Sequence, residues 1–458
     1  MSLTRTVELI FRRFLPSPFV IALLLTLATM GLALVFGAYP EGEGVGGDIL
    51  RSWEKGLWNR ELLVFAYQMM LILVLGHVLV LSRPMERLIL RLTSLTRNGA
   101  SAALLVASTT MLVSFFNWGL GLIFGAILAR KVGEYAQRQQ IPLNYPLIGA
   151  CGYVGLMIWH GGISGSAPIK VSEPGHLASL MATGAGGGAL SPFPETIPTS
   201  DTIFSAPNLL VFALVFGAIC ALVYYLGRKT GPTVISLPSY AFAPPENSTG
   251  TGAERLDRSR ILSVILGSLI FLAFMVQYLP QLKTLNLTPD MLNFFMLGLA
   301  IFLHGNIRSF LQATQEAIGD TAGILIQFPL YFGIMGIMTD SGLIHRISDF
   351  FVAVSTERTF PVFTFFSAGL VNIFVPSGGG QWAVQGPVIL EAAQRLGVSL
   401  PKAVLALSYG DQLTNMLQPF WALPLLGITR LKAREILPYT LLFMFVGGVI
   451  YLAGLWFS

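Results

Sequence analysis

Long apolar runs are the feature that most constrains the fold of this chain. A helix needs roughly 20 apolar residues to cross the core of a bilayer. Only 11% of the 458 residues are Asp, Glu, Lys or Arg, and a water-soluble domain could not cover its surface with so few charges. We therefore predict an all-α polytopic membrane protein. Nine candidate spans are 18–38, 62–81, 145–168, 206–226, 261–279, 291–304, 321–338, 402–428 and 438–457.

Two other apolar stretches, 99–131 and 360–391, are too long for one straight helix and too interrupted for two complete ones. We interpret each as a re-entrant hairpin, because irregular backbone at membrane depth needs protein or a water-filled cavity around it. The N-terminus is predicted to be cytoplasmic, since that orientation places most of the 28 Lys and Arg residues on inner segments. Arg12 and Arg13 precede a first run too long for the core of a cleaved signal, so we expect that span to be retained.

The two halves of the chain place similar polar residues in the same order. Asn117 and Asn372 are 255 residues apart, and Tyr153 and Tyr409 are 256 apart. We therefore predict a repeat, and a single connecting span makes it an inverted-topology repeat, which is typical of alternating-access carriers. The predicted order is a first repeat 1–227 (two spans, inner hairpin 99–131, interrupted span 145–168, span 206–226), a cytoplasmic linker 228–260, a connecting span 261–280, and an inverted second repeat 281–458 (outer hairpin 360–391, interrupted span 402–428).

The second hairpin contains the run Pro-Ser-Gly-Gly-Gly-Gln-Trp at 376–382. Proline removes a backbone donor and the glycines free the chain, so consecutive N–H groups and the N-terminus of the next helix can face an anion. A flexible kink is the simpler alternative. The predicted substrate contacts are Ser377, Gly378, Gly379, Gly380 and Gln381 here, with a weaker signal at Asn117, Trp118 and Gly119 in the first hairpin.

Asp411 is the clearest carboxylate predicted deep inside a span. A buried unpaired carboxylate is costly, so it should be protonated or bound to a cation. We predict that Asp411 binds the coupling ion, a proton or a sodium ion, with sodium then lying near Asp411 and Asn415. A structural pair with a neighbouring hydrogen-bond donor is the alternative. His160, in the other interrupted span, could titrate or could simply pack.

The inventory of polar groups also limits the ligand. The sequence has no acidic cluster or His-rich pattern for a metal and no paired Arg in the membrane for a phosphate. Amides, hydroxyls and helix ends beside aromatic rings suit a small monocarboxylate with a short apolar tail. We expect no cofactor beyond the coupling ion, no nucleic acid partner, and no disulfide between Cys151 and Cys220.

At these residues the sequence resembles the bacterial short-chain fatty acid transporter family of the ion transporter superfamily. The stretches that carry the resemblance are 115–121, 375–387 and 409–424. The resemblance implies a carrier for acetoacetate, butyrate or similar acids in the bacterial inner membrane, working as a homodimer by an elevator mechanism. It places the substrate between the hairpin tips, with Ser164, Asn372 and Asn415 as secondary contacts.

Two other functions are kept open. A di- or tricarboxylate carrier of the same superfamily would use a similar site. An intramembrane serine protease is a remote alternative, because Gly162-Ile163-Ser164-Gly165 matches the Gly-x-Ser-Gly motif. A nucleophilic serine needs a base within reach, so the position of His160 relative to Ser164 discriminates the two classes.

Overall fold

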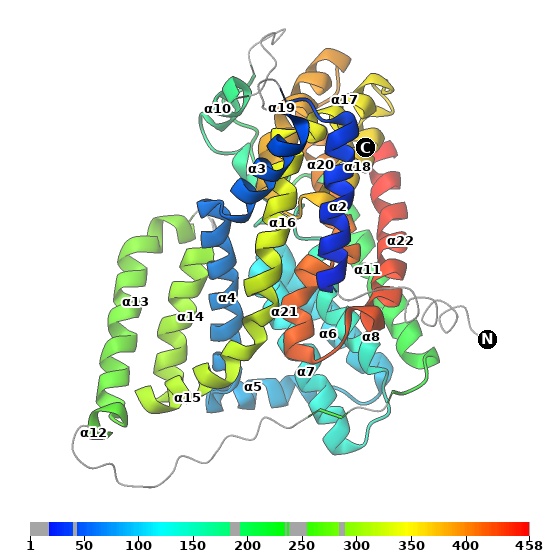
Figure 1. Ribbon diagram of the computed structural model, residues 1–458. Helices are drawn as coiled ribbons and strands as arrows, with labels where there is room; N and C mark the ends of the chain where they lie inside the picture. The colour runs from blue at the N-terminus through cyan, green and yellow to red at the C-terminus, as the bar shows by residue number, and fades with distance from the viewer. Residues whose placement is uncertain are drawn as a thin grey trace.

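The computed structural model describes residues 18–39, 44–183, 193–233, 236–237, 254–283 and 289–457. Across these ranges the chain is helical and contains no strand (Figure 1), which confirms the predicted all-α class. Residues 1–17, which include Arg12 and Arg13, lie outside the described residues. So does most of the predicted linker at 228–260. Six described helices are long and apolar enough to cross a membrane: α2 (Pro18–Phe36), α4 (Arg60–Val80), α6 (Gly99–Phe116), α11 (Ala206–Lys229), α13 (Arg260–Lys283) and α22 (Ala433–Phe457).

The exposed surfaces of these helices are apolar, as expected for helices surrounded by lipid. In α13, Ile261 is 71% exposed and Val276 is 77% exposed. Apolar side chains of this size are stable at a surface when the solvent is hydrocarbon. Helix α13 packs mainly against α14 (Pro289–His304), and α14 packs against α4, so α13 lies at the edge of the molecule (Figure 1).

Each predicted hairpin is a pair of helices joined by a very short link. Asn117 alone separates α6 from α7 (Trp118–Gln139), and the two helices pack against each other. Residues 375–377 separate α18 (Phe360–Phe374) from α19 (Gly378–Leu396). Asparagine side chains start several of these helices by accepting backbone N–H bonds, including Asn98 at α6 and Asn117 at α7.

Each predicted interrupted span is a helix that breaks and resumes. Helix α8 (Tyr145–Tyr153) tightens into η1 (Val154–Met157), and the chain is irregular until α9 (Ser166–Lys170). Helix α20 (Leu400–Thr414) continues through η3 (Asn415–Leu417) and resumes as α21 (Pro419–Thr429). The breaks follow from Gly-rich sequence in the first case and from Pro419 in the second, because proline lacks a backbone donor.

The remaining helices pack around or follow the two hairpins and the two interrupted helices. Helix α16 (Ala322–Asp340) packs against α2, α3 (Val45–Leu57) and α21, while α17 (Leu343–Ala353) packs against α18 and α19. Short helices complete the chain: α5 (Arg83–Thr93), α10 (His176–Thr183), α12 (Glu254–Asp257), α15 (Ile307–Ala317) and η2 (Ile318–Thr321). Most residues of the two breaks and of the links 117 and 375–377 are buried.

Glycines bring the first hairpin and the first interrupted helix into backbone contact. A Cβ on Gly125 of α7 would lie 2.2 Å from the carbonyl oxygen of Gly152 in α8 and 2.7 Å from Thr110 Cγ2 in α6. Small residues at such crossings let helix backbones approach closely in membranes. This contact fixes the position of the first break relative to the first hairpin.

We predict that Gly125→Ala destabilises the protein by about 1–3 kcal/mol, the usual cost of forcing an extra methyl group into a packed interface. The measurement is the apparent melting temperature of the purified protein in detergent. Gly217→Ala is the matched control, because a Cβ there meets nothing within 4 Å. Equal melting temperatures for the two variants would contradict the packing argument.

Candidate functional site

The tip of the first hairpin rests on the first interrupted helix. Asn117 has extended backbone, and its Oδ1 accepts the N–H of Leu120 at 2.8 Å. The N–H of Trp118 donates to Ser164 Oγ at 2.9 Å, and the N–H of Ile163 donates to the Phe115 carbonyl at 2.8 Å. Ser164, a predicted secondary contact, therefore holds the first N–H of helix α7.

The tip of the second hairpin reaches the same break from the other half of the chain. Ser377 Oγ accepts the N–H of Gly380 at 3.2 Å and starts α19. A Cβ on Gly378 would lie 2.7 Å from Trp159 Cη2 and 2.9 Å from His160 Cε1, so a side chain is sterically excluded there. Gly379 is exposed, and the nearest atom to its hypothetical Cβ is Ser166 Oγ at 3.9 Å.

Trp159 lies between the two tips. Its ring centroid is 5.8 Å from that of Trp118, and Trp118 is in turn 5.1 Å from Trp421 of α21. The indole Nε1 of Trp159 is buried and has no hydrogen-bond partner among the described residues. A buried unpaired donor at the meeting point of two helix N-termini is a group that an anion could satisfy. Sequence reasoning did not single out Trp159.

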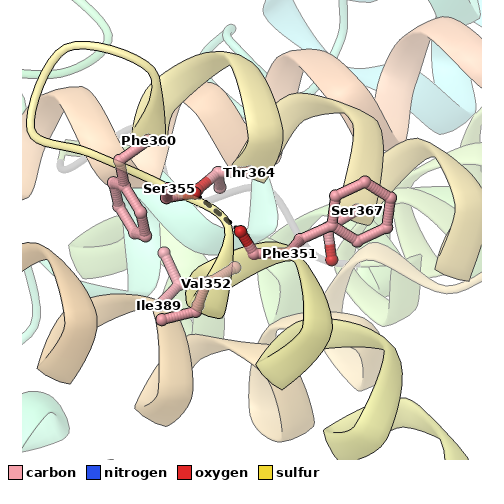
Figure 2. A pocket seen from close by; sticks show the side chains of 7 residues that line it. All are labelled: Phe351, Val352, Ser355, Phe360, Thr364, Ser367 and Ile389. Carbon is pink, nitrogen blue, oxygen red and sulfur yellow. Dashed lines mark hydrogen bonds between the residues drawn. The ribbon is translucent and has the colours of Figure 1, made fainter.

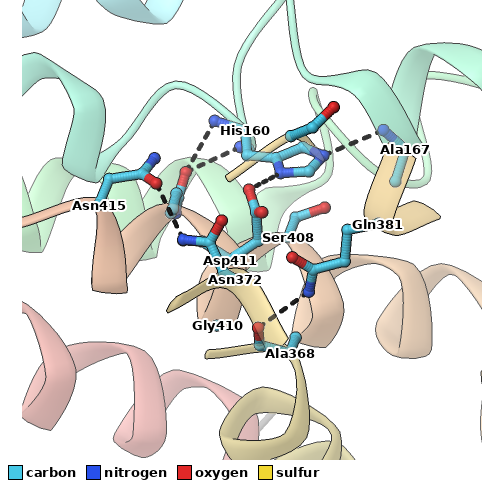
Figure 3. Close-up of polar contacts among 12 residues, drawn as sticks. His160, Ala167, Ala368, Asn372, Gln381, Ser408, Gly410, Asp411 and Asn415 are labelled. Atoms are coloured by element: carbon cyan, nitrogen blue, oxygen red, sulfur yellow. Dashed lines mark hydrogen bonds and ion pairs between the residues drawn. The ribbon is translucent and has the colours of Figure 1, made fainter. Parts of the chain in front are cut away.

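Asp411 pairs with His160 across the two halves (Figure 3). His160 Nδ1 and Asp411 Oδ2 are 2.5 Å apart, and both side chains are essentially inaccessible to solvent. The N–H of Ala167 in α9 donates to His160 Nε2 at 3.1 Å. Asp411 Oδ1 is buried without a hydrogen-bond partner among the described residues. The predicted carboxylate is thus deep in the protein, but its partner is a histidine 251 residues away.

Asn372 holds the second hairpin against the second break. Its Nδ2 lies 2.7 Å from the Asp411 carbonyl, 2.9 Å from Thr414 Oγ1 and 2.9 Å from Asn415 Oδ1. Asn415 Nδ2 donates to the Leu156 carbonyl in η1 at 3.3 Å. The side chain of Gln418 donates to the Asn372 carbonyl. Asn372 and Asn415, predicted as secondary substrate contacts, are fully buried within this network.

Gln381 is also turned inward. Its Nε2 donates to the Ala368 carbonyl at 2.9 Å and to Gln385 Oε1 at 2.7 Å, and Gln385 Nε2 donates to Ser367 Oγ at 3.2 Å. This chain of amides connects α18 and α19. It ends beside a small cavity between α17, α18 and α19 (Figure 2), lined by Phe351, Val352, Ser355, Phe360, Thr364, Ser367 and Ile389.

The predicted site residues therefore separate into two groups. Trp118, Ser164, Ser377, Gly379 and Gly380 are at least partly accessible. Asn117, Gly119, Asn372, Gly378, Gln381, Asp411 and Asn415 are buried. The structure therefore leaves only the first group open to contact from outside the packed interior.

The geometry also bears on the protease motif. Ser164 Oγ accepts a backbone N–H, and both ring nitrogens of His160 are engaged by Asp411 and Ala167. Neither nitrogen faces Ser164 in the described network, so the histidine does not serve as its base.

Tyrosines connect the two breaks reciprocally. Tyr153 of α8 donates to the carbonyls of Asn415 at 2.7 Å and Gln418 at 3.1 Å. Tyr409 of α20 donates to Asn208 Oδ1 at 2.7 Å, and Asn208 Nδ2 donates to the Gly161 carbonyl at 2.9 Å. Each tyrosine therefore satisfies, directly or through Asn208, carbonyls that the other half's break leaves without helical partners.

Helices that break in an apolar interior and are satisfied there by polar side chains are typical of multi-pass membrane transporters. A profile of the short chain fatty acid transporter family matches residues 1–458, so the chain belongs to that family. Two relatives carry the same family name. The one from Escherichia coli K12 is 37% identical over 460 residues, covering 97% of this chain and 96% of that protein. The one from Haemophilus influenzae Rd is 34% identical over 451 residues, covering 97% of each.

Solved structures that resemble the chain include two transport proteins. The YdaH transporter of Alcanivorax borkumensis gives a TM-score of 0.45 at 15% identity over 96% of this chain and 98% of that one. The MtrF efflux pump of Neisseria gonorrhoeae gives 0.41 at 14% identity over 98% and 97%. The family match and the six apolar helices make the chain a multi-pass protein of the bacterial cytoplasmic membrane.

We predict that Tyr153→Phe lowers the stability of the protein by about 1–3 kcal/mol, because two buried carbonyls lose their donor. The apparent melting temperature in detergent should fall accordingly. Tyr224→Phe is the control, since Tyr224 is exposed on α11. An unchanged melting temperature for Tyr153→Phe would mean that the bridge between the breaks contributes little.

Proposed function

We propose that this protein is a secondary active transporter of short-chain fatty acids, such as acetoacetate, butyrate or similar monocarboxylates. Transport is coupled to a cation and proceeds by alternating access of the elevator type. The family membership supports the substrate class. A homodimer, as the family resemblance implies, is part of the proposal.

The observation that carries the proposal is the convergence of the two hairpin tips at Trp159. Helices α7 and α19 both begin there, and helix N-termini favour negative charge. The unpaired Trp159 N–H adds a donor. A carboxylate held beside Trp118, Ser377 and Gly379 would give this indole N–H a hydrogen-bond acceptor, and it would need no fixed positive charge nearby.

Aromatic rings beside the tips suit a short apolar tail. Trp421 packs edge-on against Trp118, and Phe420 packs against Trp421 with centroids 4.9 Å apart. Arg130 is buried, but it is twelve residues beyond the start of α7, where it pairs with Glu134 at 2.7 Å. A second carboxylate would therefore lack a nearby guanidinium among the described residues of the tips, which favours a monocarboxylate over a dicarboxylate.

The inverted repeat is supported by the reciprocal contacts. Each half contributes a hairpin and an interrupted helix, and Tyr153 and Tyr409 each reach toward the break of the opposite half. We assign the spans before each hairpin and the connecting helix α13 to a fixed scaffold, with the N-terminus cytoplasmic. The hairpins, interrupted helices, α11 and α22 form the moving unit.

The boundary between these two parts is aromatic. Phe420 of α21 stacks on Phe328 of α16 at 3.9 Å between centroids, and Tyr331 lies 5.0 Å away edge-on. Contacts between rings, such as these between α16 and α21, let two bodies slide without breaking strong directional bonds. This supports an elevator movement of α21 along α16.

Gly379→Leu should reduce uptake of labelled acetoacetate and butyrate into proteoliposomes by at least about tenfold, since even 1.4 kcal/mol of lost binding corresponds to that factor. The Cβ itself has room, so the protein should fold while the side chain fills the tip. Gly217→Leu, on the exposed side of α11, is the matched control. Full uptake by Gly379→Leu would exclude a substrate site at the tip.

Asp411→Asn should abolish accumulation of substrate against its concentration gradient, because an amide cannot gain or lose the coupling charge. The measurement is the ratio of internal to external labelled substrate in energised proteoliposomes. Competition with succinate and citrate in the same vesicles tests the alternative substrate class. Unchanged accumulation by Asp411→Asn would remove the coupling role from this residue.

A further inference from the structure

The pair formed by Asp411 and His160 identifies the coupling ion. We infer that this pair is a proton-binding site, so that one proton enters with each monocarboxylate anion and sodium has no part in the cycle. The inference rests on the proposed transport function and makes it more specific. It is carried by the hydrogen-bond geometry of the pair and by the position of Asn372.

The hydrogen bonds around His160 fix where its proton lies. The N–H of Ala167 points at Nε2, so Nε2 is an acceptor and carries no proton. A neutral imidazole then bears its proton on Nδ1, which donates to Asp411 Oδ2 at 2.5 Å. A second proton cannot bind Nε2 without breaking the bond to Ala167. The atom open to an added proton is therefore Asp411 Oδ1, which is buried and has no partner among the described residues.

Asn372 occupies the position that a sodium ion would need. The amide nitrogen of Asn372 lies 2.7–2.9 Å from three oxygens, which are the Asp411 carbonyl, Thr414 Oγ1 and Asn415 Oδ1. Oxygens of these kinds are the usual ligands of hard cations. Here all three surround the amide nitrogen of Asn372, whose two N–H groups point toward them, so that nitrogen fills the space between these oxygens.

The hydrogen-bond contacts of the pair include no other charged side chain among the described residues. Helix α18 carries no charged residue. The neighbouring titratable groups are the hydroxyls of Tyr153 and Tyr409, each donating to protein oxygens, and Tyr451, which donates to Met157 O. The charged groups on the other elements packed nearby are Lys170, Glu391, Arg395, Lys402, Arg434 and Glu435, with Arg228 and Lys229 on α11 and Arg130, Lys131, Glu134 and Arg138 in the second half of α7.

The pair is in contact with the substrate tip. Gly378 packs against His160 Cε1, so the imidazole separates the start of α19 from Asp411. A substrate anion at that tip and an ionised Asp411 would repel each other in a medium of low dielectric constant. Protonation of Oδ1 removes this repulsion. The proton and the anion therefore bind together and leave together, and the cycle transfers no net charge.

The test uses wild-type protein in proteoliposomes and labelled acetoacetate, with proton and sodium gradients imposed separately. Protein-free vesicles correct for diffusion of the neutral acid. An inward proton gradient of one pH unit should drive accumulation about tenfold above the level without a gradient, since one pH unit is about 1.4 kcal/mol. A sodium gradient should have no effect, and an imposed membrane potential should not change the rate.

The pH profile of labelled-substrate exchange tests the residues. Asp411→Asn should remove the pH dependence. His160→Ala removes the side chain that pairs with the carboxylate, so its pH profile should differ from that of the wild type. Gly217→Ala should keep the wild-type profile. These readouts distinguish a proton site from a merely structural pair, which would leave the profile unchanged in both variants.

Accumulation that follows sodium, or an Asp411→Asn profile identical to wild type, would overturn the inference. Absence of any exchange of acetoacetate or butyrate by folded wild-type protein would instead overturn the proposed function. Should Asp411→Asn fail to give monodisperse protein, the gradient experiment on the wild type still decides between proton and sodium.

Discussion

The whole arrangement depends on keeping a carboxylate and several backbone carbonyls inside an apolar bundle. The carboxylate of Asp411 is buried, and its one hydrogen-bond partner among the described residues is the imidazole of His160. An isolated charge there would be costly, so the helices that carry the two residues must stay together. Because one residue comes from each half of the chain, this pair links the two interrupted helices at the depth where both lose regular hydrogen bonding.

The same need explains why the polar residues of the interior are mostly amides and hydroxyls. Tyr153, Asn208 and Asn372 donate to carbonyls that a broken helix leaves unsatisfied. Neutral donors meet this need without adding charge that would require its own partner. The anion site that we propose at the tips then consists of backbone N–H groups and the indole of Trp159.

Much of the fold could be predicted from residue patterns. The apolar runs gave most of the helices, and 99–131 and 360–391 fell on α6–α7 and α18–α19, each pair joined at the predicted Asn117 and Ser377. Asp411 was expected deep in a span, and it is buried. The partner of Asp411 was missed, since nothing in the local sequence of His160 distinguishes a hydrogen-bonded histidine from a packing one. Trp159 was missed because a tryptophan in an apolar run is typical of any buried helix.

The sequence by itself determined that this protein lies in a membrane, because its content of charged residues is low. It also determined where the helices break, because glycine and proline act on the backbone locally. It also determined which residues could carry an ion or meet an anion. Only the tertiary structure decided which of them meet, since the contact between His160 and Asp411 joins positions 251 residues apart. It likewise turned Asn372, Gln381 and Asn415 inward and left Trp159 between the tips, because packing of whole helices sets the direction in which each side chain points.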